Sequence, residues 1–383
     1  MKRKVSRLLA LTAAAATLAG ALTACGNPNA SGGGDCKDAK YAIGNMGALS
    51  GPNAGLGTVM RDGAKTAIDL YNKKHSDAKV CLVEEDSQGN EKDAPGVAKQ
   101  LVKNKKVLGV VGPGFSGESM AADPIFDEAG LTIISGSATA PELAEKGWKV
   151  FHRTIGNDAV QGPADAKFIE ETLKAKKVFV VDDKTAYGAG LSKTLQKALG
   201  DKVVGTEHSK TKQTEFGPII SKVKQAKPDV IFYSGYYPEG GPFADQLRKA
   251  GVKATFVGPD GLKDENFIKG AGKAHAEGTI LTCPCIPGEK AKGTFAKDFK
   301  KDIGEAPGTY GAEAFDAANV FLDGINSGIK DRKAMLDYVN KYDKDGASKH
   351  IKFDSKGNIE EDVVWTYKVK DGKIVANAPI EMS

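Results

Sequence analysis

The feature that most constrains the fold is an alternation of short apolar runs with stretches of helical period, which occurs twice along the chain. The apolar runs cover 41–46, 80–84, 107–111 and 131–135 in the first series, and 178–181, 203–206, 230–234 and 254–257 in the second. Between them, apolar residues recur three and four positions apart, as at Met60, Ala64, Ala67 and Tyr71. Strands alternating with helices predict parallel sheets covered by helices, an α/β fold.

Two segments indicate that the second series repeats the first. Residues 107–112 (VLGVVG) lead through a helical stretch to 129–131 (AGL), and residues 230–235 (VIFYSG) lead through a helical stretch to 250–252 (AGV). In both, a glycine ends the strand and an Ala-Gly pair ends the helix at nearly equal spacing. A chain of 383 residues is also longer than one compact core accommodates. We therefore predict two similar parallel-sheet lobes.

The carboxyl-terminal part adds helical patterns at 310–321 and 335–342 and a last strand pattern at 363–369. These are too few for a third domain, so we expect them to return to the two lobes and to create several chain crossings, which form a hinge. The predicted lobes comprise residues 37–154 with 285–362, and residues 155–284 with 363–383.

The amino-terminal segment predicts export and lipid anchoring. Four basic residues within the first seven precede the apolar run Leu8–Leu18, which is too short to cross a bilayer and is typical of a signal peptide. Leu-Thr-Ala-Cys25 then resembles a bacterial lipobox, although an ordinary signal with a chance cysteine is the alternative. We expect residues 1–24 to be removed and the glycine-rich residues 25–36 to form a flexible tether whose Cys25 is lipidated. The folded part of the chain would then be extracytoplasmic and anchored to the cell membrane.

Charge and histidine placement exclude several function classes. Loss of the signal segment removes four positive charges and no negative ones, so the formal net charge falls from +5 to +1, and we expect no nucleic-acid partner. The histidines fall outside the candidate loops and lack metal-ligand spacing. No Gly-x-Ser-x-Gly elbow stands at a strand-to-helix turn. We predict no metal, no cofactor and no enzymatic activity; an extracellular hydrolase is the alternative that these absences disfavour.

The remaining four cysteines are an even number in a compartment where disulfides persist. Cys36 precedes the first predicted strand and Cys81 lies in the second, and these strands would be neighbours in a parallel sheet. We therefore predict a Cys36–Cys81 disulfide. Cys283 and Cys285, in a Cys-Pro-Cys sequence, either form a small ring or stay reduced, and we assign them no catalytic role.

The candidate site lies in loops at the carboxyl ends of the predicted strands, where the amino termini of the following helices present N–H groups. These loops are 47–52, 112–117 and 136–141 in the first lobe, and 182–188, 235–240 and 258–261 in the second. Residues 112–117 (GPGFSG) match the dinucleotide fingerprint. The following strand lacks an acidic residue for a ribose, and the motif is not on the first strand, so we reject a nicotinamide cofactor. Such glycines still favour an anion at a helix start, here a carboxylate.

The second lobe offers the opposite chemistry. Tyr187 and Tyr236 supply aromatic faces, and Asp260 supplies a negative charge at a strand end; an ammonium group binds to such a set. A carboxylate held by one lobe and an ammonium by the other predict an α-amino acid ligand bound when the lobes close. Taken singly, Ser116 and Thr139 are typical helix caps and Asp260 a typical turn residue, so the prediction depends on their placement in corresponding loops.

At these loops the chain resembles the periplasmic leucine/isoleucine/valine-binding protein family, the solute receptors of branched-chain amino acid ABC importers. The segments that carry the resemblance are 47–52 (GALSGP), 138–143 (ATAPEL), 153–154 (RT), 161–163 (QGP), 183–188 (DKTAYG), 235–239 (GYYPE) and 258–261 (GPDG). It implies a type I periplasmic binding fold, a Venus flytrap of two lobes joined by a multi-strand hinge. It also implies the permease subunits of an importer as partners, and we expect a monomer.

The resemblance assigns ten residues to the ligand site. They are Leu56, Phe115, Ser116, Ser137, Ala138, Thr139, Tyr187, Tyr236, Asp260 and Tyr310. It implies that Ser116 contacts the ligand carboxylate, that Asp260 contacts the ammonium group, and that Ser137 and Thr139 contact both. Tyr187 and Tyr236 correspond to tyrosines that close over the ligand, and Leu56, Phe115 and Tyr310 line the side-chain pocket.

Three positions depart from the family pattern. Leu56 replaces an aromatic residue, Asp260 replaces a glutamate that is common in the family, and Phe115 replaces a cysteine, so that the Cys36–Cys81 bridge would substitute for the family disulfide. We expect Glu118, near the same helix start, to be a surface residue that offsets the helix dipole; the alternative is that it reshapes the site. The same fold used as a sensor, or as a receptor for amides, urea or aromatic acids, is the alternative function.

Overall fold

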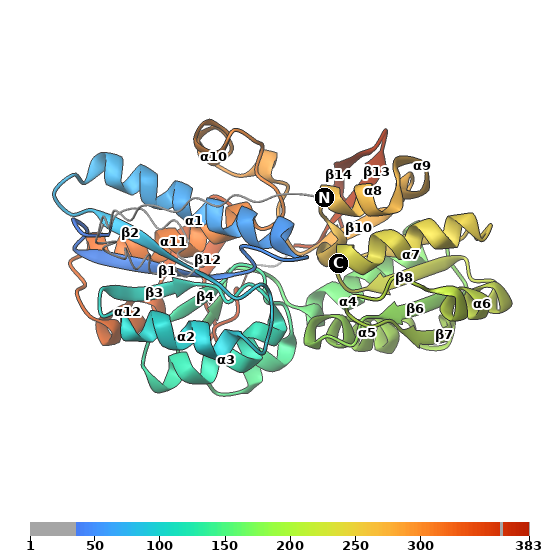
Figure 1. The fold of residues 1–383 in the computed structure, drawn as a ribbon, viewed down its shortest axis with the longest axis horizontal. Coiled ribbons are helices and arrows are strands. Elements are labelled where there is room, and N and C mark those ends of the chain that lie inside the picture. The colour runs from blue at the N-terminus through green and yellow to red at the C-terminus, as the bar shows by residue number, and fades with distance from the viewer. Residues whose placement is uncertain (1–35, 361–362, 383) are drawn as a thin grey trace, which may run out of the picture. The chain divides into compact units, whose positions relative to one another are not determined.

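The computed structural model describes residues 36–360 and 363–382. Strands in these ranges form a five-stranded sheet, a seven-stranded sheet and a small two-stranded sheet. We call the five-stranded sheet sheet A and the part of the chain built on it lobe 1; the seven-stranded sheet is sheet B, and it organises lobe 2 (Figure 1). The two predicted α/β lobes are therefore present.

Sheet A is parallel throughout and has the order β2-β1-β3-β4-β5. Its strands are β1 (Tyr41–Gly47), β2 (Val80–Asp86), β3 (Val107–Val111), β4 (Ile133–Ser135) and β5 (Phe151–Arg153). Helices α1 (Ala54–Lys74) and α11 (Gly311–Asn326) pack together on one face, and α2 (Ala94–Lys103) and α3 (Ser116–Glu128) on the other. Alternate strand residues therefore enter different cores: Ala42 packs with the α2 side and Ile43 with the α1 side.

Sheet B has the order β14-β13-β10-β9-β8-β6-β7. Its parallel strands are β6 (Val178–Asp182), β7 (Val203–His208), β8 (Val230–Ser234), β9 (Thr255–Gly258) and β10 (Ile280–Cys283), and its antiparallel edge is β13 (Trp365–Lys370) and β14 (Lys373–Pro379). The helices around it are α4 (Asp158–Lys167), α5 (Ala186–Leu199), α6 (Gly217–Ala226), α7 (Tyr237–Lys249) and α8 (Glu265–Ala271). Val180 packs with Leu191 of α5, whereas Val181 joins the core that contains Phe243 of α7. Both faces of sheet B are thus covered.

The chain passes repeatedly between the lobes. Strand β5 ends in sheet A, and the next helix, α4, packs on α5 and β10 of lobe 2. Strand β10 ends at Cys283, and the following α10 (Phe295–Ile303) packs on α1 of lobe 1. Lobe 1 continues through α12 (Arg332–Val339) and the hairpin β11 (Asp343–Asp345) and β12 (His350–Lys352), before the chain returns to sheet B at β13. These crossings form the expected multi-strand hinge.

Two disulfides are present in the described residues. Cys36 is bonded to Cys81 with Cα atoms 5.5 Å apart, and Cys283 is bonded to Cys285. The first ties the segment before β1 to β2, and the second spans the point where the chain leaves β10.

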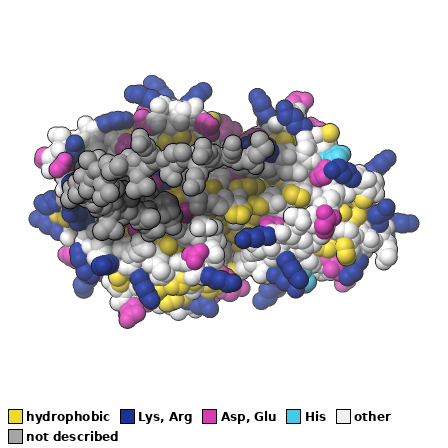
Figure 2. Space-filling model, in the orientation of Figure 1, with side chains coloured by type: hydrophobic (Ala, Val, Ile, Leu, Met, Phe, Trp, Pro, Cys, Tyr) yellow, Lys and Arg dark blue, Asp and Glu magenta, His cyan; other side chains and the backbone are white. Residues whose placement is uncertain are grey.

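The predicted signal peptide and Cys25, the predicted site of lipidation, lie outside the described residues. Figure 2 shows a surface on which basic and acidic side chains are interspersed.

Candidate ligand-binding site

In each sheet, the direction in which successive parallel strands are added reverses at one place. In sheet A the reversal lies between β1 and β3, and in sheet B it lies between β6 and β8. Loops from neighbouring strands diverge at such a point and leave a crevice at the carboxyl ends of the strands, which is where open α/β sheets bind ligands. In lobe 1, Phe115 lies in the loop after β3. In lobe 2, Tyr187 lies in the first turn of α5, and Tyr236 immediately precedes α7.

A small cavity lies at these loops, and both lobes contribute to its walls. The lining residues are Leu56, Met60, Gly114, Phe115, Ser137 and Tyr310 from lobe 1, and Tyr187, Tyr236, Asp260 and Gly261 from lobe 2. The space between these walls, counted together with the solvent that reaches it, is about 240 Å³. Because both lobes enclose it, the cavity is suited to a small solute and not to a macromolecule.

Asp260 supplies the negative charge of the cavity. It begins the short 3-10 helix η4 (Asp260–Leu262) after β9 and is only 3% exposed. The hydroxyl of Tyr187 donates to Asp260 Oδ1 at 2.8 Å, and the hydroxyl of Tyr310 donates to Oδ2. Burial raises the pKa of Asp260, while hydrogen bonds from Tyr310, Gln161 and Tyr187 favour its ionised form. A buried carboxylate that faces a cavity in this way is suited to a cationic group.

Two further carboxylates, Asp158 and Asp165 of α4, are fully buried near Asp260. Burial raises the pKa of both well above the usual range, and the charge of Asp260 raises it further. The neutral form of both α4 carboxyls is therefore favoured. Asp260 accepts hydrogen bonds from two tyrosine hydroxyls, and its anion is the best supported of the three.

An aromatic pair forms one wall of the cavity. The Tyr236 ring lies edge-on to the Phe115 ring, with centroids 5.4 Å apart, and 5.1 Å from the Tyr187 ring. Phe115 and Tyr236 also line a wider, polar cleft on their other side, together with residues such as Lys184 and Glu239. One ring from each lobe thus stands between the small cavity and the outer cleft.

The lobe 1 wall combines apolar side chains with a helix start. Leu56 and Met60 lie one turn apart on α1, and Phe115 immediately precedes α3, whose amino terminus carries a partial positive charge. The Ser137 hydroxyl donates to Gly114 O at 2.5 Å. This wall is therefore suited to an aliphatic group beside an anion.

Three of the expected site residues do not line the cavity. Ser116 Oγ accepts a hydrogen bond from Ala140 N at 3.1 Å, and Thr139 O accepts one from Asp158 N at 3.0 Å. The carbonyl of Ala138 accepts a hydrogen bond from the Arg153 guanidinium at 3.1 Å. Ser116, Thr139 and Ala138 therefore fix the loop 136–141, from which Ser137 reaches the cavity.

The expectation that Glu118 is a surface residue is wrong, because it is fully buried. Its Oε2 accepts a hydrogen bond from Phe115 N at 3.0 Å, and its Oε1 accepts one from the Ser87 hydroxyl. Burial raises the pKa of Glu118 to about 7 despite these donors. The interior donors allow the carboxyl to be buried, and it fixes the backbone at Phe115.

Sequence reasoning missed Met60, Gly114 and Gly261 as lining residues and Arg153 as a support. Met60 lies four residues after Leu56 on the same helix face, so its position was accessible from the helical period. Gly114 and Gly261 are chain neighbours of predicted residues. The Arg153 side chain is only 1% exposed and holds the carbonyls of Ala138 and Ala140, a role without a local sequence signal.

Among residues 36–360 and 363–382, no group of His, Cys, Asp and Glu side chains has the arrangement of a metal site. No helix in the described part of the chain is long and apolar enough to span a bilayer.

Two α/β lobes with a solute-sized cavity between their switch-point loops define a two-lobed solute receptor. A family model described as periplasmic binding protein matches residues 40–373. The chain therefore belongs to the periplasmic binding protein family.

Individual relatives cover most of the chain. The leucine-specific-binding protein of Salmonella typhimurium is 31% identical over 94% of this chain and 95% of its own length. A leucine-, isoleucine-, valine-, threonine- and alanine-binding protein of Pseudomonas aeruginosa is 33% identical over 82% of this chain and 86% of its own. A branched-chain amino acid transporter substrate-binding protein of Streptococcus pneumoniae, solved with isoleucine, superimposes with a TM-score of 0.82 at 26% identity, covering 89% of this chain and 100% of its own.

Proposed function

We propose that this chain is the extracytoplasmic receptor of an ABC importer and binds an α-amino acid, branched-chain or otherwise aliphatic, between its lobes. The observation that carries the proposal is the buried Asp260 carboxylate facing lobe 1 across the cavity, with Tyr187 and Tyr310 as its donors. The ligand ammonium binds to this carboxylate. The relatives named for leucine, isoleucine and valine support this solute class.

The opposite wall receives the other parts of the ligand. The carboxylate is directed to the amino terminus of α3 and to the Ser137 hydroxyl, with Ser116, Ala138 and Thr139 fixing the loops that carry these groups. Leu56, Met60 and Phe115 contact the side chain. Because the ammonium and the carboxylate are held by different lobes, the ligand has higher affinity for the closed arrangement, and its binding favours closure.

The receptor binds its ligand without chemical turnover. In the described part of the chain, the one hydroxyl of the cavity that resembles a nucleophile, that of Ser137, donates to a backbone carbonyl and not to a base. Its cavity lining contains no histidine, lysine or cysteine. This composition supports recognition over catalysis.

Location and partners follow from the same proposal. Residues 1–24 direct export, Cys25 carries lipid, and the receptor works as a membrane-anchored monomer that delivers ligand to permease subunits. We retain 37–154 with 285–362 as lobe 1, and 155–284 with 363–383 as lobe 2.

A thermal-shift panel of aliphatic, acidic and aromatic amino acids, amides and urea, run with native mass spectrometry, tests the proposal. We expect stabilisation by aliphatic amino acids and a 1:1 complex of unchanged mass. Stabilisation by urea or amides alone, or release of a chemically altered ligand, would contradict it.

A further inference from the structure

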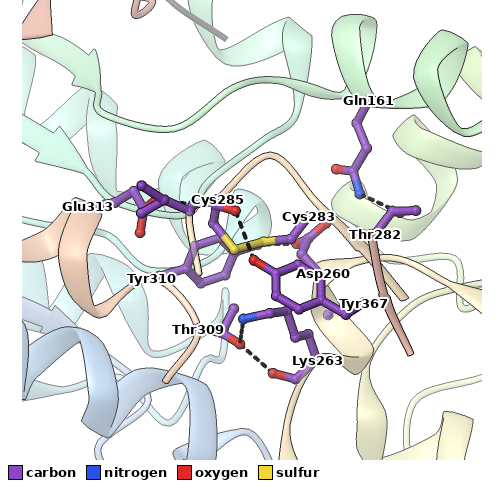
Figure 3. The surroundings of a disulfide bond; sticks show 12 residues. Gln161, Asp260, Lys263, Thr282, Cys283, Cys285, Thr309, Tyr310, Glu313 and Tyr367 are labelled. Atoms are coloured by element: carbon purple, nitrogen blue, oxygen red, sulfur yellow. Dashed lines mark hydrogen bonds between the residues drawn. A yellow bond between two sulfur atoms is a disulfide. The ribbon is translucent and has the colours of Figure 1, made fainter. Parts of the chain in front are cut away.

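A buried residue pair joins the lobes beside the cavity. Lys263 directly follows η4 in lobe 2 and is only 9% exposed, and Thr309 precedes α11 in lobe 1. Lys263 Nζ donates to Thr309 Oγ1 at 3.2 Å, and the Thr309 hydroxyl donates to the carbonyl of Lys263 (Figure 3). One residue of each lobe thus exchanges two hydrogen bonds with the other.

The lysine lies against Tyr367 of β13, the strand by which the chain returns to lobe 2. Its Nζ lies 4.3 Å from the centre of the Tyr367 ring, a cation–π distance. The Tyr367 hydroxyl donates to the carbonyl of Cys285 at 3.1 Å, and Cys285 is tied to Cys283 by the buried disulfide (Figure 3). The ammonium of Lys263 is therefore positioned against a covalently constrained crossing, not on a mobile surface loop.

Each member of the pair lies close in sequence to a residue of the candidate ligand site. Thr309 precedes Tyr310, whose hydroxyl donates to Asp260, and Lys263 lies three residues after Asp260. Tyr310 adopts φ +69°, a left-handed conformation that disfavours residues with a Cβ. With that backbone, two successive side chains of lobe 1, Thr309 and Tyr310, both reach the 260–263 segment of lobe 2. Lys263 and Thr309 themselves are not in the cavity lining.

We propose that Lys263 and Thr309 form a latch that stabilises the closed lobes and thereby sets how slowly ligand leaves, without contacting the ligand. The inference rests on the proposed function, because it requires that a ligand binds between closing lobes. A group that stabilises only the closed state increases apparent affinity by the same factor as it increases closure. Since the cavity must open before ligand departs, the latch acts mainly on the dissociation rate.

The charge on Lys263 makes the latch pH-dependent. Burial lowers the pKa of Lys263 to about 8, although Glu313 of α11, Glu289, Asp260 and Asp264 favour the charged form. Opening hydrates the ammonium and returns its pKa towards the usual value of about 10.4. Closure therefore releases a proton between these two values, and linkage predicts an affinity about tenfold higher at pH 9 than at pH 7 from this group.

Stopped-flow dissociation of L-leucine from the full chain tests the latch at pH 9, where most of the closed-state Lys263 amine is neutral and its burial opposes closure less than at pH 7. Lys263→Met keeps the stem over Tyr367 and removes the donor, and Thr309→Val removes the hydroxyl with little change of shape. We expect each variant to release leucine 10–100 times faster than the wild type with an association rate within threefold, and the double variant to match the single ones. Lys269→Met changes an exposed lysine of the same lobe and should leave both rates unchanged.

Two readouts separate a latch from a merely structural role. The gain in affinity between pH 7 and pH 9 should be about tenfold smaller in Lys263→Met than in the wild type, because the variant lacks the titrating amine. The ligand's own titration is common to both proteins and cancels in this comparison. The unfolding temperature of each ligand-free variant should stay within a few degrees of the wild-type value. Wild-type dissociation rates in both variants would overturn the latch while leaving the proposed function intact; failure of the wild type to bind any amino acid would overturn the proposed function and the latch with it.

Discussion

Asp260 is a buried carboxylate whose charge is maintained by its neighbours. Burial works against ionisation and raises its pKa, whereas the hydroxyls of Tyr310 and Tyr187 stabilise the anion. Those two donors come from different lobes, so the charged form is best supported when the lobes are together. In the proposed function, ammonium recognition and lobe closure are therefore coupled at one side chain.

Replacement of this charge tests that coupling. Asp260→Asn keeps an acceptor for Tyr187 but removes the negative charge, so we expect the affinity for L-leucine to fall at least 30-fold, on the order of 2 kcal/mol or more. Isothermal titration at pH 7 measures the change. Glu265→Gln, an exposed carboxyl on the same lobe, is the control and should bind as the wild type does; equal loss in both variants would contradict the assignment.

Acidification gives an independent measure of the same residue. Because the folded pKa of Asp260 is raised above the ordinary 3.8, the carboxylate is protonated at a higher pH than a free one. The contribution of this carboxylate to affinity should be constant above that pKa and decrease as pH falls through it, by up to about tenfold per pH unit. Asp260→Asn should lose this dependence. A variant that retained the wild-type pH profile would place the titrating group elsewhere.

Phe115 limits the size of the ligand in this account, because its ring and that of Tyr236 stand between the cavity and the outer cleft. Phe115→Ala removes one side of that wall. We expect affinity for leucine to fall at least tenfold and affinity for phenylalanine or tryptophan to increase, together with a loss of about 3 kcal/mol of stability. Titration with the three amino acids measures this; unchanged relative affinities would show that the wall does not select by size.

For single residues, the sequence predicted which chemical groups occur near the site better than it predicted which way their side chains face. Tyr187, Tyr236 and Asp260 were predictable because they stand in loops or helix starts at strand ends, and strand ends of a parallel sheet converge. Ser116 and Thr139 lie in loops just as suggestive, yet the Ser116 hydroxyl accepts from Ala140 N and the Thr139 carbonyl accepts from Asp158 N, and neither residue lines the cavity. Which way a loop side chain faces depends on distant donors and acceptors, and these have no local signal.

The start of α3 shows how an element depends on a buried acid. Glu118 binds the backbone N–H of Phe115 and the hydroxyl of Ser87, and so joins α3 to the segment after β2. Its pKa of about 7 lies above the ordinary 4.5. The folded state therefore holds this proton more tightly than the unfolded chain, and the stability from the protonated form is lost as pH rises from about 4.5 through 7.

Glu118→Gln removes that titration. We expect the free energy of unfolding of the variant, relative to the wild type, to increase by about 2–3 kcal/mol between pH 5 and pH 8. Urea denaturation of both proteins at both pH values measures this change. The effects of other titrating groups, such as Asp183, are the same in both proteins and cancel in the comparison. A relative stability that does not change with pH would mean that Glu118 stays ionised in the folded protein.

Most elements were predictable from hydrophobic period, but short ones were not. The predicted strands at 107–111 and 230–234 have the bounds found for β3 and β8. By contrast, β5 has three residues and β10 has four, too few to show a period, and only their neighbours in the sheets define them. Helix α7 begins at Tyr237, inside the loop expected at 235–240, because Pro238 is favourable in the first turn of a helix.

For the molecule as a whole, stability and recognition are built at opposite ends of sheet A. The Cys36–Cys81 bond ties the segment before β1 to the beginning of β2, whereas the cavity lies at the carboxyl ends of the strands. Replacing both cysteines by serine should lower the free energy of unfolding by about 4 kcal/mol, the loop-entropy value for this separation. Leucine affinity should change less than twofold. Urea unfolding and titration measure the two effects; a large loss of affinity would indicate that the disulfide shapes the site.

The two-lobe architecture was predictable because it repeats, and repetition is visible over hundreds of residues. The antiparallel pair β13 and β14, which returns the carboxyl terminus to sheet B, was foreseen only as a single strand at 363–369. The joining of Cys283 to Cys285 could not be decided from the sequence either, because it depends on how the crossing after β10 folds against Tyr367.

The central claim is that one lobe holds the ammonium group of an amino acid and the other holds its carboxylate. Isothermal titration of the purified receptor with L-leucine, N-acetyl-L-leucine and L-leucinamide tests it most directly, since each analogue removes one charge and keeps the side chain. The account predicts 1:1 binding of leucine and at least 100-fold weaker binding of both analogues. Binding of either analogue as tightly as leucine would contradict it.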